Sequence, residues 1–568
     1  RIQLIIVFKG LKLLGCCCYT LRLINDYSMW AAFICRKGAD ILLIASLTFI
    51  FICIQCKALT SQTHNTIVNR SITRQSRRVG KAAERIRTRL HATSSQNLAS
   101  TSAPSKFTFE FHSSIKSIPV EKWNSCLSFD SSPFLEHAWL SSLEESGCAS
   151  PETGWAPQHI AVKVKKTGEL CGYVPLYIKG HSMGEFIFDN SWAEAASQSG
   201  IPYYPKLLVA VPFTPVAGER LLLHSSFQKY RKQIRSAVAD FLMQVAHSNN
   251  LSSVHFNFCT DEEATDLSGS DITDGNEKIN ESVEQQIEPK SQRLASQVQQ
   301  MLKRLSSSKN DYMRRTSLQY HWTNVNPNNK GQQFSSFEDY LSCFKSKRRI
   351  TIRRERRRVL EEEGIRIQVV KGEEIRRIPG LVERMFDIYI STVERMVWGR
   401  KYLTLEFFQQ LVKSDFCDNI CFFCATRSSR GSALKADNVF AGTFNIIKNG
   451  VFYGRYWGCL PGQEVKNLHF ETCYWSTIEF CIQQGLHRIE PGAGGGDYKW
   501  ARGFDPALIH STHYICHPGL RRAVRQFLAY ETDNNVELTE YLRSKSSVIN
   551  NKKSNNSTIE STEPIQKS

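Results

Sequence analysis

The stretch VFAGTFNIIKNGVFYGRYWG, residues 439–458, carries a clear structural signal. Apolar and polar side chains alternate on both sides of Asn449-Gly450, the dipeptide that most favours a two-residue turn between antiparallel strands. A further strand pattern precedes it in ICFFCATR, residues 420–427. Together these segments predict a three-stranded antiparallel meander.

A helix and one more strand follow this meander. Residues 467–485 repeat apolar side chains at helical spacing and end at Gly485, a residue common just past a helix C-terminus. The expected buried face consists of Phe470, Tyr474, Ile478 and Cys481. Residues 487–493, HRIEPGA, read as the next strand, while a helix at 335–360 and a strand at 365–370 come before the meander. This order of elements predicts an α+β fold with mixed, mostly antiparallel sheets.

The first half of the chain shows a similar alternation. HIAVKVKKTGELCGYVPLYIKG, residues 159–180, reads as a hairpin around Thr167-Gly168, and SVHFNFC, residues 253–259, as a short strand. Residues 260–311 are polar, acidic and poor in aromatic side chains, which predicts a disordered insertion or a solvated helix. Strand character returns at residues 317–325.

The order of meander, helix and strand resembles the core of the GNAT acyltransferase superfamily. Several longer segments resemble the FemAB-like family, whose members are labelled as peptidoglycan biosynthesis or recognition acyltransferases. These segments are YYPKLLVAVPFTPVAGERLL (203–222), RRITIRRERRRVLEEEGI (348–365), YGRYWG (453–458), LHFETCYW (468–475) and GAGGGDYKWARGFDP (492–506).

The resemblance implies an N-acyltransferase built from two tandem GNAT-like domains. We expect the N-terminal domain at residues 107–330, interrupted by the acidic insertion at 260–311. The C-terminal domain is expected at 331–535, followed by a disordered tail at 536–568.

Residues 1–106 have a different composition and are expected to be a leader. Between residues 57 and 106 the chain is rich in Ser, Thr and Arg and contains Glu84 as its only acid, which is typical of an organelle transit peptide. Plastid import is the favoured interpretation and mitochondrial import an alternative. The apolar run 41–54 is shorter than a membrane-spanning helix needs, so it suggests a membrane anchor or signal core only as a further alternative.

The formal net charge of +18 is concentrated locally. Nine Lys and Arg residues against Glu355 fall within residues 341–358. The apolar spacing of this predicted helix also places Arg348 on its buried stripe, where a charge needs a partner or a ligand. The outward basic side chains suggest tRNA as a partner, with a simply solvated face as the alternative.

Acyl transfer to an amine, which the resemblance implies, needs a base for the amine proton. Glu471 is predicted in the first turns of the helix at 467–485 and Glu490 in the strand after it. We therefore expect both carboxylates at one cleft, where one has a raised pKa and acts as the base. His469 is an adjacent candidate base, and Tyr456 is a candidate proton donor to the leaving group. Alternatively, Glu471 is a helix-start acid favoured by the dipole, and Tyr456 belongs to the core.

The glycine-rich residues 492–496 fit neither GxGxxG nor GxxxxGK[ST], so a phosphate-binding loop is not expected. We expect a loop at the rim of the cleft, where Gly494 lets a substrate approach the backbone. Lys499 and Arg502 would contact an anionic part of that substrate. A plain turn is the alternative interpretation.

The acyl donor is expected to be acyl-CoA or aminoacyl-tRNA, acting as a co-substrate, with no tightly bound cofactor and no metal. Acetyl-CoA-dependent GNAT enzymes usually carry [QR]xxGx[GA] at the start of the central helix, and the run from Arg455 to Leu460 misses its last position. Arg455 remains a candidate donor-binding residue. Lys206, in a proline-rich segment near the expected domain interface, is another. The amine acceptor is not defined by the sequence.

Two other functions remain open. A non-catalytic module on the same fold would use the cleft and the basic helix to bind RNA or a glycan. Cys417, Cys421 and Cys424 have the CxxxCxxC spacing of radical SAM enzymes, but two of them fall in a predicted strand, whose side chains alternate between faces.

Overall fold

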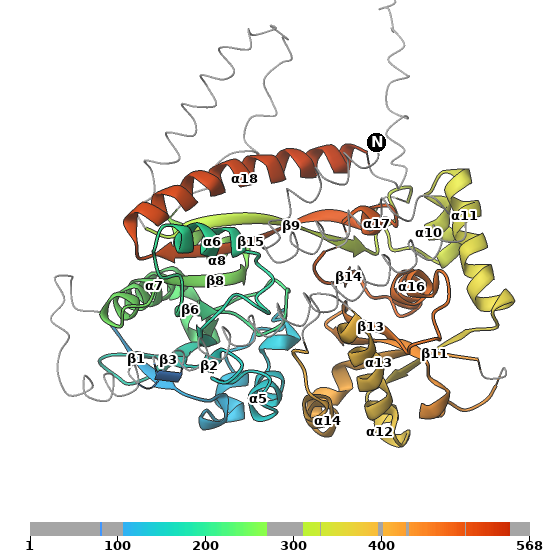
Figure 1. The fold of residues 1–568 in the computed structure, drawn as a ribbon, viewed down its shortest axis with the longest axis horizontal. Coiled ribbons are helices and arrows are strands. Elements are labelled where there is room, and N and C mark those ends of the chain that lie inside the picture. The colour runs from blue at the N-terminus through green and yellow to red at the C-terminus, as the bar shows by residue number, and fades with distance from the viewer. Residues whose placement is uncertain are drawn as a thin grey trace, which may run out of the picture. The chain divides into compact units, whose positions relative to one another are not determined.

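The computed structural model describes residues 106–269 and 311–545, apart from 330, 396–400, 428–430 and 495, together with residues 80, 81 and 84. Contacts divide the chain into Arg1–Thr73 and Arg74–Ser568, and every described residue belongs to the second unit. The transit-type segment, the apolar run 41–54, most of the acidic insertion and the end of the tail fall outside the described residues. Figure 1 shows the fold.

The predicted meander is present in the second half. Its strands pair antiparallel in chain order: β11 (Ile420–Thr426), β12 (Ala441–Lys448) and β13 (Val451–Cys459). Asn449 and Gly450 form the turn with positive φ angles of 50° and 74°, as a two-residue hairpin turn requires. The neighbouring strands are β10 (Arg366–Lys371), antiparallel to β11, and β14 (Arg488–Glu490), parallel to β13.

The central helix connects β13 to β14 in three consecutive segments: α15 (Leu468–Phe470), the π-helical turn η7 (Glu471–Trp475) and α16 (Ser476–Gln483). Tyr474, Ile478 and Cys481 are buried as predicted, and Phe470 is half-buried. Gly485, with φ of 65°, follows the helix end. The π turn is the part of this helix that the apolar spacing did not indicate.

The single helix predicted at 335–360 is wrong, because the segment folds as two helices and a π-helical turn: α10 (Phe337–Ser342), α11 (Ser346–Arg357) and η4 (Arg358–Glu362). The break buries Cys343 and Phe344 and brings the Phe344 ring to 5.2 Å from that of Tyr340. Burial of these side chains outweighs continuation of the helix.

Helices and short turns complete the second half: α12 (Glu373–Arg377), α13 (Leu381–Arg395), α14 (Leu405–Lys413), η5 (Asp415–Asn419), η6 (Ala436–Asn438) and α17 (Gly496–Trp500). The sheet is packed on both faces. Phe422 and Cys424 of β11 join the core that contains α13 and α14, whereas Cys421 and Phe423 join the core with α10 and α16. Cys417 lies in the former core, so the three cysteines of the CxxxCxxC pattern do not share one site.

Gly458 marks a close approach between β13 and α13. A Cβ atom added there would lie 1.9 Å from the carbonyl oxygen of Ile388. We expect Gly458→Ala to lower the free energy of unfolding by about 1–3 kcal/mol, because helix and strand must separate. Gly454→Ala on the same strand is the matched control, since its nearest contact would be an ordinary 3.4 Å. Urea denaturation of both variants measures the difference, and equal midpoints would contradict the packing account.

The first half repeats the arrangement of meander, helix and parallel strand. Its meander is formed by β2 (Trp155–Pro157), β5 (Leu176–Lys179) and β6 (Lys206–Val209). Helix α7 (Arg231–Ser248) then leads to β8 (Ser253–Cys259), which pairs parallel to β6. This repeat agrees with the two tandem GNAT-like domains that the resemblance implied.

A small second sheet lies in this half, in the order β1 (Phe107–His112), β3 (His159–Val164), β4 (Leu170–Val174) and β7 (Leu222–Leu223). It includes the predicted hairpin at 159–180 as β3 and β4. The remaining elements are η1 (Ile115–Ser117), α4 (Val120–Asn124), η2 (Pro133–Leu135), α5 (His137–Glu145), α6 (Asn190–Gln198), η3 (Ser225–Tyr230) and α8 (Asp261–Ser268).

Two long antiparallel strands join the halves into one eleven-stranded sheet. β9 (Met313–Thr323) comes from the end of the first half but pairs with β14, while β15 (Asp505–Ile515) comes from the second half but pairs with β8. The two strands also pair with each other. Figure 1 shows α18 (Pro518–Ser544) running along this pair. Each half therefore completes its sheet with a strand from the other.

Two regions that were predicted to be disordered, the first with a solvated helix as the alternative, begin with packed helices. The insertion expected at 260–311 begins with α8, whose buried Glu263 accepts hydrogen bonds from the backbone N–H groups of Arg220 and Leu221, both at 2.8 Å. The tail expected at 536–568 begins inside α18, where Thr539 is buried. An acidic or polar composition does not reveal such individual tertiary contacts.

Candidate active site

The candidate site lies where β13 and β14 separate. The parallel pairing covers only Val451 to Tyr453, with Tyr453 opposite Glu490. Beyond it, the β12–β13 register shifts, since Asn445 faces Gly454 and Phe444 faces Tyr456, so Arg455 is the extra residue of a bulge. A bulge bends its strand, and here it coincides with the point where β14 ends.

Glu490 is the last residue of β14 and is buried, with 6% of its surface exposed. Its Oε1 pairs with Arg488 Nη2 at 3.1 Å, and His321 Nε2 lies 4.0 Å from Oε2. Oε2 has no hydrogen-bond partner among the described residues. Burial raises the pKa of Glu490 from 4.5 to about 7, although Arg488 and Arg455 oppose the change. A carboxyl group with such a pKa and a free oxygen is suited to act as a general base near neutral pH.

Lys499 is close to the same group of residues. Its buried ammonium donates a hydrogen bond to the carbonyl oxygen of Gly492 at 2.6 Å. Burial lowers the pKa of Lys499 from 10.5 to about 8. Burial also lowers the pKa of His321 to about 3, with contributions from Arg488 and then Lys499, so the imidazole beside Glu490 is neutral.

The glycine-rich segment forms the turn that places Lys499. Gly492 and Gly494 have positive φ angles of 82° and 77°, and α17 starting at Gly496 has only five residues. Because the helix that follows the glycines is this short, the segment does not have the geometry of a phosphate-binding loop. The role of Gly494 at a substrate rim stays a prediction.

His469 and Arg502 lie beside Lys499. Burial lowers the pKa of His469 to about 4, and Arg502 and Lys499 lower it further. Arg502 is buried, with its guanidinium carbon 3.7 Å from the Phe470 ring centroid, and it donates to the carbonyl oxygen of Tyr498 at 2.9 Å. The structure thus brings together three predicted site residues, but it places Arg502 mainly against aromatic rings.

Arg455 and Tyr456 lie on β13 at the bulge. Arg455 donates from Nη2 to the carbonyl oxygen of Phe213 at 2.6 Å, which connects the two halves of the molecule. Arg455 to Cys459 lie within β13, not at the start of the central helix, so the run does not form the pyrophosphate-binding loop of acetyl-CoA-dependent GNAT enzymes, from whose motif its sequence also departs. Tyr456 packs against Tyr389 with ring centroids 4.9 Å apart, and burial raises its pKa.

Glu471 has different partners from Glu490. Its side chain is 1% exposed and accepts hydrogen bonds from Arg356 Nε at 3.1 Å and from Ser476 Oγ at 2.8 Å. Arg356 also bonds Glu479 at 2.5 Å. These contacts describe a structural ion pair between α11 and the central helix. None of them supports the expectation that Glu471 and Glu490 share one cleft.

The other two predicted binding residues, Arg348 and Lys206, make contacts in different parts of the structure. Arg348 is half-buried, 5.9 Å from the Trp475 ring centroid, and it lowers the pKa of Arg502 after burial, the larger cause. Lys206 is fully buried in the first half, where Nζ bonds Asp189 at 2.6 Å and Glu185 at 2.9 Å. Both carboxylates and Ser182 satisfy this ammonium, so its contacts are those of a core ion cluster.

The sequence did not reveal His321 or Arg488 as members of the site. His321 belongs to β9, which pairs with β14 across a separation of more than 160 residues, and Gln319 on the same strand bonds the carbonyl oxygen of Pro215 at 3.0 Å. Alternation along β9 puts Gln319 and His321 on one face, but only the pairing with β14 brings that face to Glu490.

Neither a metal centre nor a membrane-spanning helix is found in the part of the chain that the structure describes. Within residues 106–269 and 311–545, outside the short gaps, no three His, Cys, Asp or Glu side chains are grouped as metal ligands. Over the same ranges, the helices lack the combined length and apolarity needed to cross a bilayer.

The repeated meander, helix and parallel strand, with a bulge where β13 and β14 separate, define two tandem GNAT-like domains. A model of the FemAB-like family, described as peptidoglycan biosynthesis/recognition, matches residues 114–288 and 277–549. The chain belongs to this family and is an acyltransferase.

Several solved structures are similar in arrangement at low sequence identity. FemX is 13% identical, with coverage of 74% of this chain and 100% of that chain and a TM-score of 0.37. L-PGS from Bacillus licheniformis is 10% identical, with 68% and 95% coverage and a TM-score of 0.34. A tandem GNAT protein from the clavulanic acid biosynthesis pathway is 10% identical, with 72% and 99% coverage and a TM-score of 0.32. No curated protein matches the chain.

Proposed function

We propose that this acyltransferase transfers an acyl group from a thioester or an ester donor to an amine, with Glu490 as the general base. The observation that carries the proposal is the buried Glu490 carboxyl group, which has an unpaired Oε2 and a pKa raised to about 7 by burial. Its position at the separation of β13 and β14 supports the same assignment.

In this mechanism the amine nitrogen attacks the acyl carbonyl carbon, and Glu490 accepts the amine proton. The new C–N bond forms as the C–S bond of an acyl-CoA, or the C–O bond of an aminoacyl-tRNA, breaks. The proton then passes to the leaving thiolate or alkoxide. Lys499, like Glu490, lies near His321. Its lowered pKa of about 8 leaves the ammonium group mostly protonated at neutral pH, so it can stabilise negative charge.

The test is product detection with the full chain. We expect mass spectrometry to find a new amide after incubation with an amine mixture and either a series of acyl-CoA esters or charged tRNA. Free CoA thiol or deacylated tRNA should accumulate in equal amount. Binding of RNA or a glycan without release of thiol or deacylated tRNA from any donor would contradict this function and favour the non-catalytic module.

A further inference from the structure

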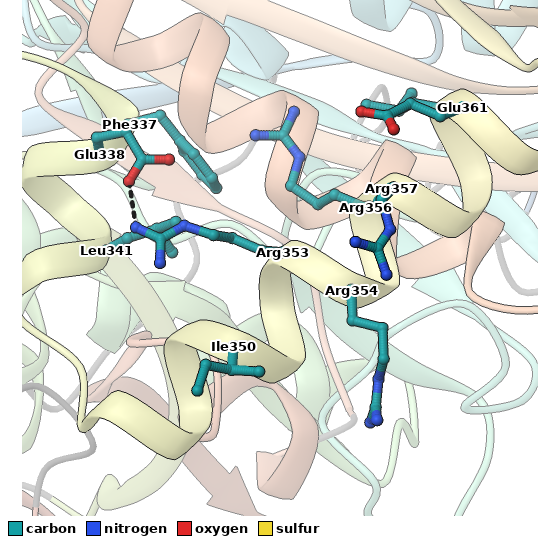
Figure 2. A pocket seen from close by; sticks show the side chains of 10 residues that line it. Phe337, Glu338, Leu341, Ile350, Arg353, Arg354, Arg356, Arg357 and Glu361 are labelled. Carbon is teal, nitrogen blue, oxygen red and sulfur yellow. Dashed lines mark hydrogen bonds and ion pairs between the residues drawn. The ribbon is translucent and has the colours of Figure 1, made fainter.

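A groove of about 520 Å³ lies between α10 and α11, within the size range of small-molecule sites. Figure 2 shows its lining side chains, which come from these two helices and the turn η4. They are Phe337, Glu338, Leu341, Ile350, Arg353, Arg354, Arg356, Arg357, Leu360 and Glu361. None of the residues assigned to the reaction belongs to this lining.

Two arginines of the lining lack a close ion pair. Four guanidinium groups and two carboxylates line the groove, but Arg353 pairs with Glu338 and Arg356 pairs with Glu471 and Glu479, which lie outside the lining. The Arg354 side chain has no hydrogen-bond or ion-pair partner among the described residues. Arg357 has only a long contact of 3.6 Å with Glu362, and both side chains are more than half exposed. Such exposed pairs contribute little, so these guanidinium groups are available to a ligand.

Arg356 is a fixed element of the groove. Its guanidinium carbon lies 4.3 Å from the Phe337 ring centroid, and its Nε and Nη2 atoms are held by Glu471 and Glu479. Nη1 has no described hydrogen-bond partner, so a preoriented donor remains. Planar guanidinium groups bind phosphate oxygens with paired hydrogen bonds, and a held side chain loses less entropy on binding.

Apolar side chains accompany these arginines. Phe337 and Leu341 are buried at the groove, whereas Ile350 on α11 is 61% exposed. An exposed isoleucine beside unpaired arginines suits a ligand that joins an apolar group to an anion. Figure 2 shows Arg353 directed toward Glu338, its ion-pair partner at 2.6 Å, and this exposed pair can open to a phosphate.

We propose that the groove between α10 and α11 binds an organic phosphate, in which a phosphate or diphosphate group is attached to an apolar moiety. The phosphate oxygens would be bound by Arg354, Arg357 and the free edge of Arg356, and the apolar part would lie against Ile350. This site is distinct from the residues proposed for acyl transfer, and it does not depend on that reaction. Its ligand is either a free organic phosphate or a phospholipid headgroup.

Direct binding to the full chain tests the proposal without any activity assay. The probes are inorganic pyrophosphate, coenzyme A, and phosphatidylcholine vesicles with or without phosphatidic acid. The double variant Arg354→Gln/Arg357→Gln removes the two unpaired groups of the groove. Lys345→Gln/Lys347→Gln is the matched control, because it removes the same charge from exposed positions of the same segment outside the lining.

We expect the arginine double variant to raise the Kd of a bound probe about tenfold and the lysine control to change it less than about twofold. Binding of coenzyme A that the arginine double variant weakens identifies a free organic phosphate as the ligand source, whereas coenzyme A that binds both double variants equally well occupies another site and would overturn that source. Binding of only the phosphatidic acid vesicles identifies a lipid headgroup. Absence of binding by every probe at low ionic strength would overturn the proposal. Equal weakening by both double variants would also overturn it, since it would indicate only the general charge of the helix.

Discussion

Glu490→Gln is expected to lower kcat/KM on the order of 100- to 10,000-fold, the range for loss of a general base. The same variant should be more stable than the parent chain at pH 8. Burial raises the pKa of Glu490 from 4.5 to about 7. The stability that the protonated carboxyl group provides is therefore fully present below pH 4.5 and is lost as the pH rises to about 7. A glutamine avoids this cost, which is at most about 3 kcal/mol.

The opposite signs of the two effects make this variant informative. If Glu490 had only a structural role, its replacement would lower both the stability and the activity of the protein. If Glu490 is a base held in an unfavourable environment, its replacement lowers the activity alone. Arg488→Gln serves as the control, because it removes the Glu490 ion pair of 3.1 Å but leaves the carboxyl group. It should raise the midpoint of the pH dependence of activity, since Arg488 lowers the pKa of Glu490. Full activity in Glu490→Gln would contradict the assignment.

Arg356→Met is expected to lower the free energy of unfolding by about 3–5 kcal/mol, because it leaves Glu471 buried without its charge partner. The double variant Arg356→Met/Glu471→Met should recover a large part of this loss, since a buried ion pair is often replaceable by apolar side chains. Chemical denaturation of the two single variants and the double variant forms a thermodynamic cycle that isolates the interaction.

Arg353→Met provides the matched control for this cycle. Arg353 lies on the same helix as Arg356, but its ion pair with Glu338 of α10 is exposed, so we expect little change in stability. If Arg356→Met and Arg353→Met have the same small effect, the pair between α11 and the central helix is not structural. Glu471 would then again be a candidate for the chemistry.

The meander, the central helix and the strand position of Glu490 were predictable because local patterns define them. The Asn449-Gly450 turn sets the hairpin, and the apolar side chains from Tyr474 to Cys481 set the buried face of the helix. Glu490 follows from its place at the end of the next strand. Each of these inferences uses residues that are close together in the chain, where periodicity and turn preferences act.

The residues that surround the carboxylates were not predictable in the same way. Arg356 is 115 residues before Glu471, and His321 reaches Glu490 only because β9 of the first half pairs with β14 of the second half. The break between α10 and α11 also depends on tertiary packing, since Phe344 is buried in a core that contains Trp475 and Phe504. Sequence spacing gives the faces of elements but not which distant faces meet.

The pH dependence of kcat/KM, measured for the parent chain and for Glu490→Gln, tests the assignment of Glu490 as the general base. We expect the rate of the parent chain to rise about tenfold per pH unit on the acid side and to level off near pH 7, where Glu490 loses its proton. The residual activity of Glu490→Gln should lack this limb. A limb that persists in the variant, or a midpoint near the usual glutamate pKa of about 4.3, would contradict Glu490 as the base.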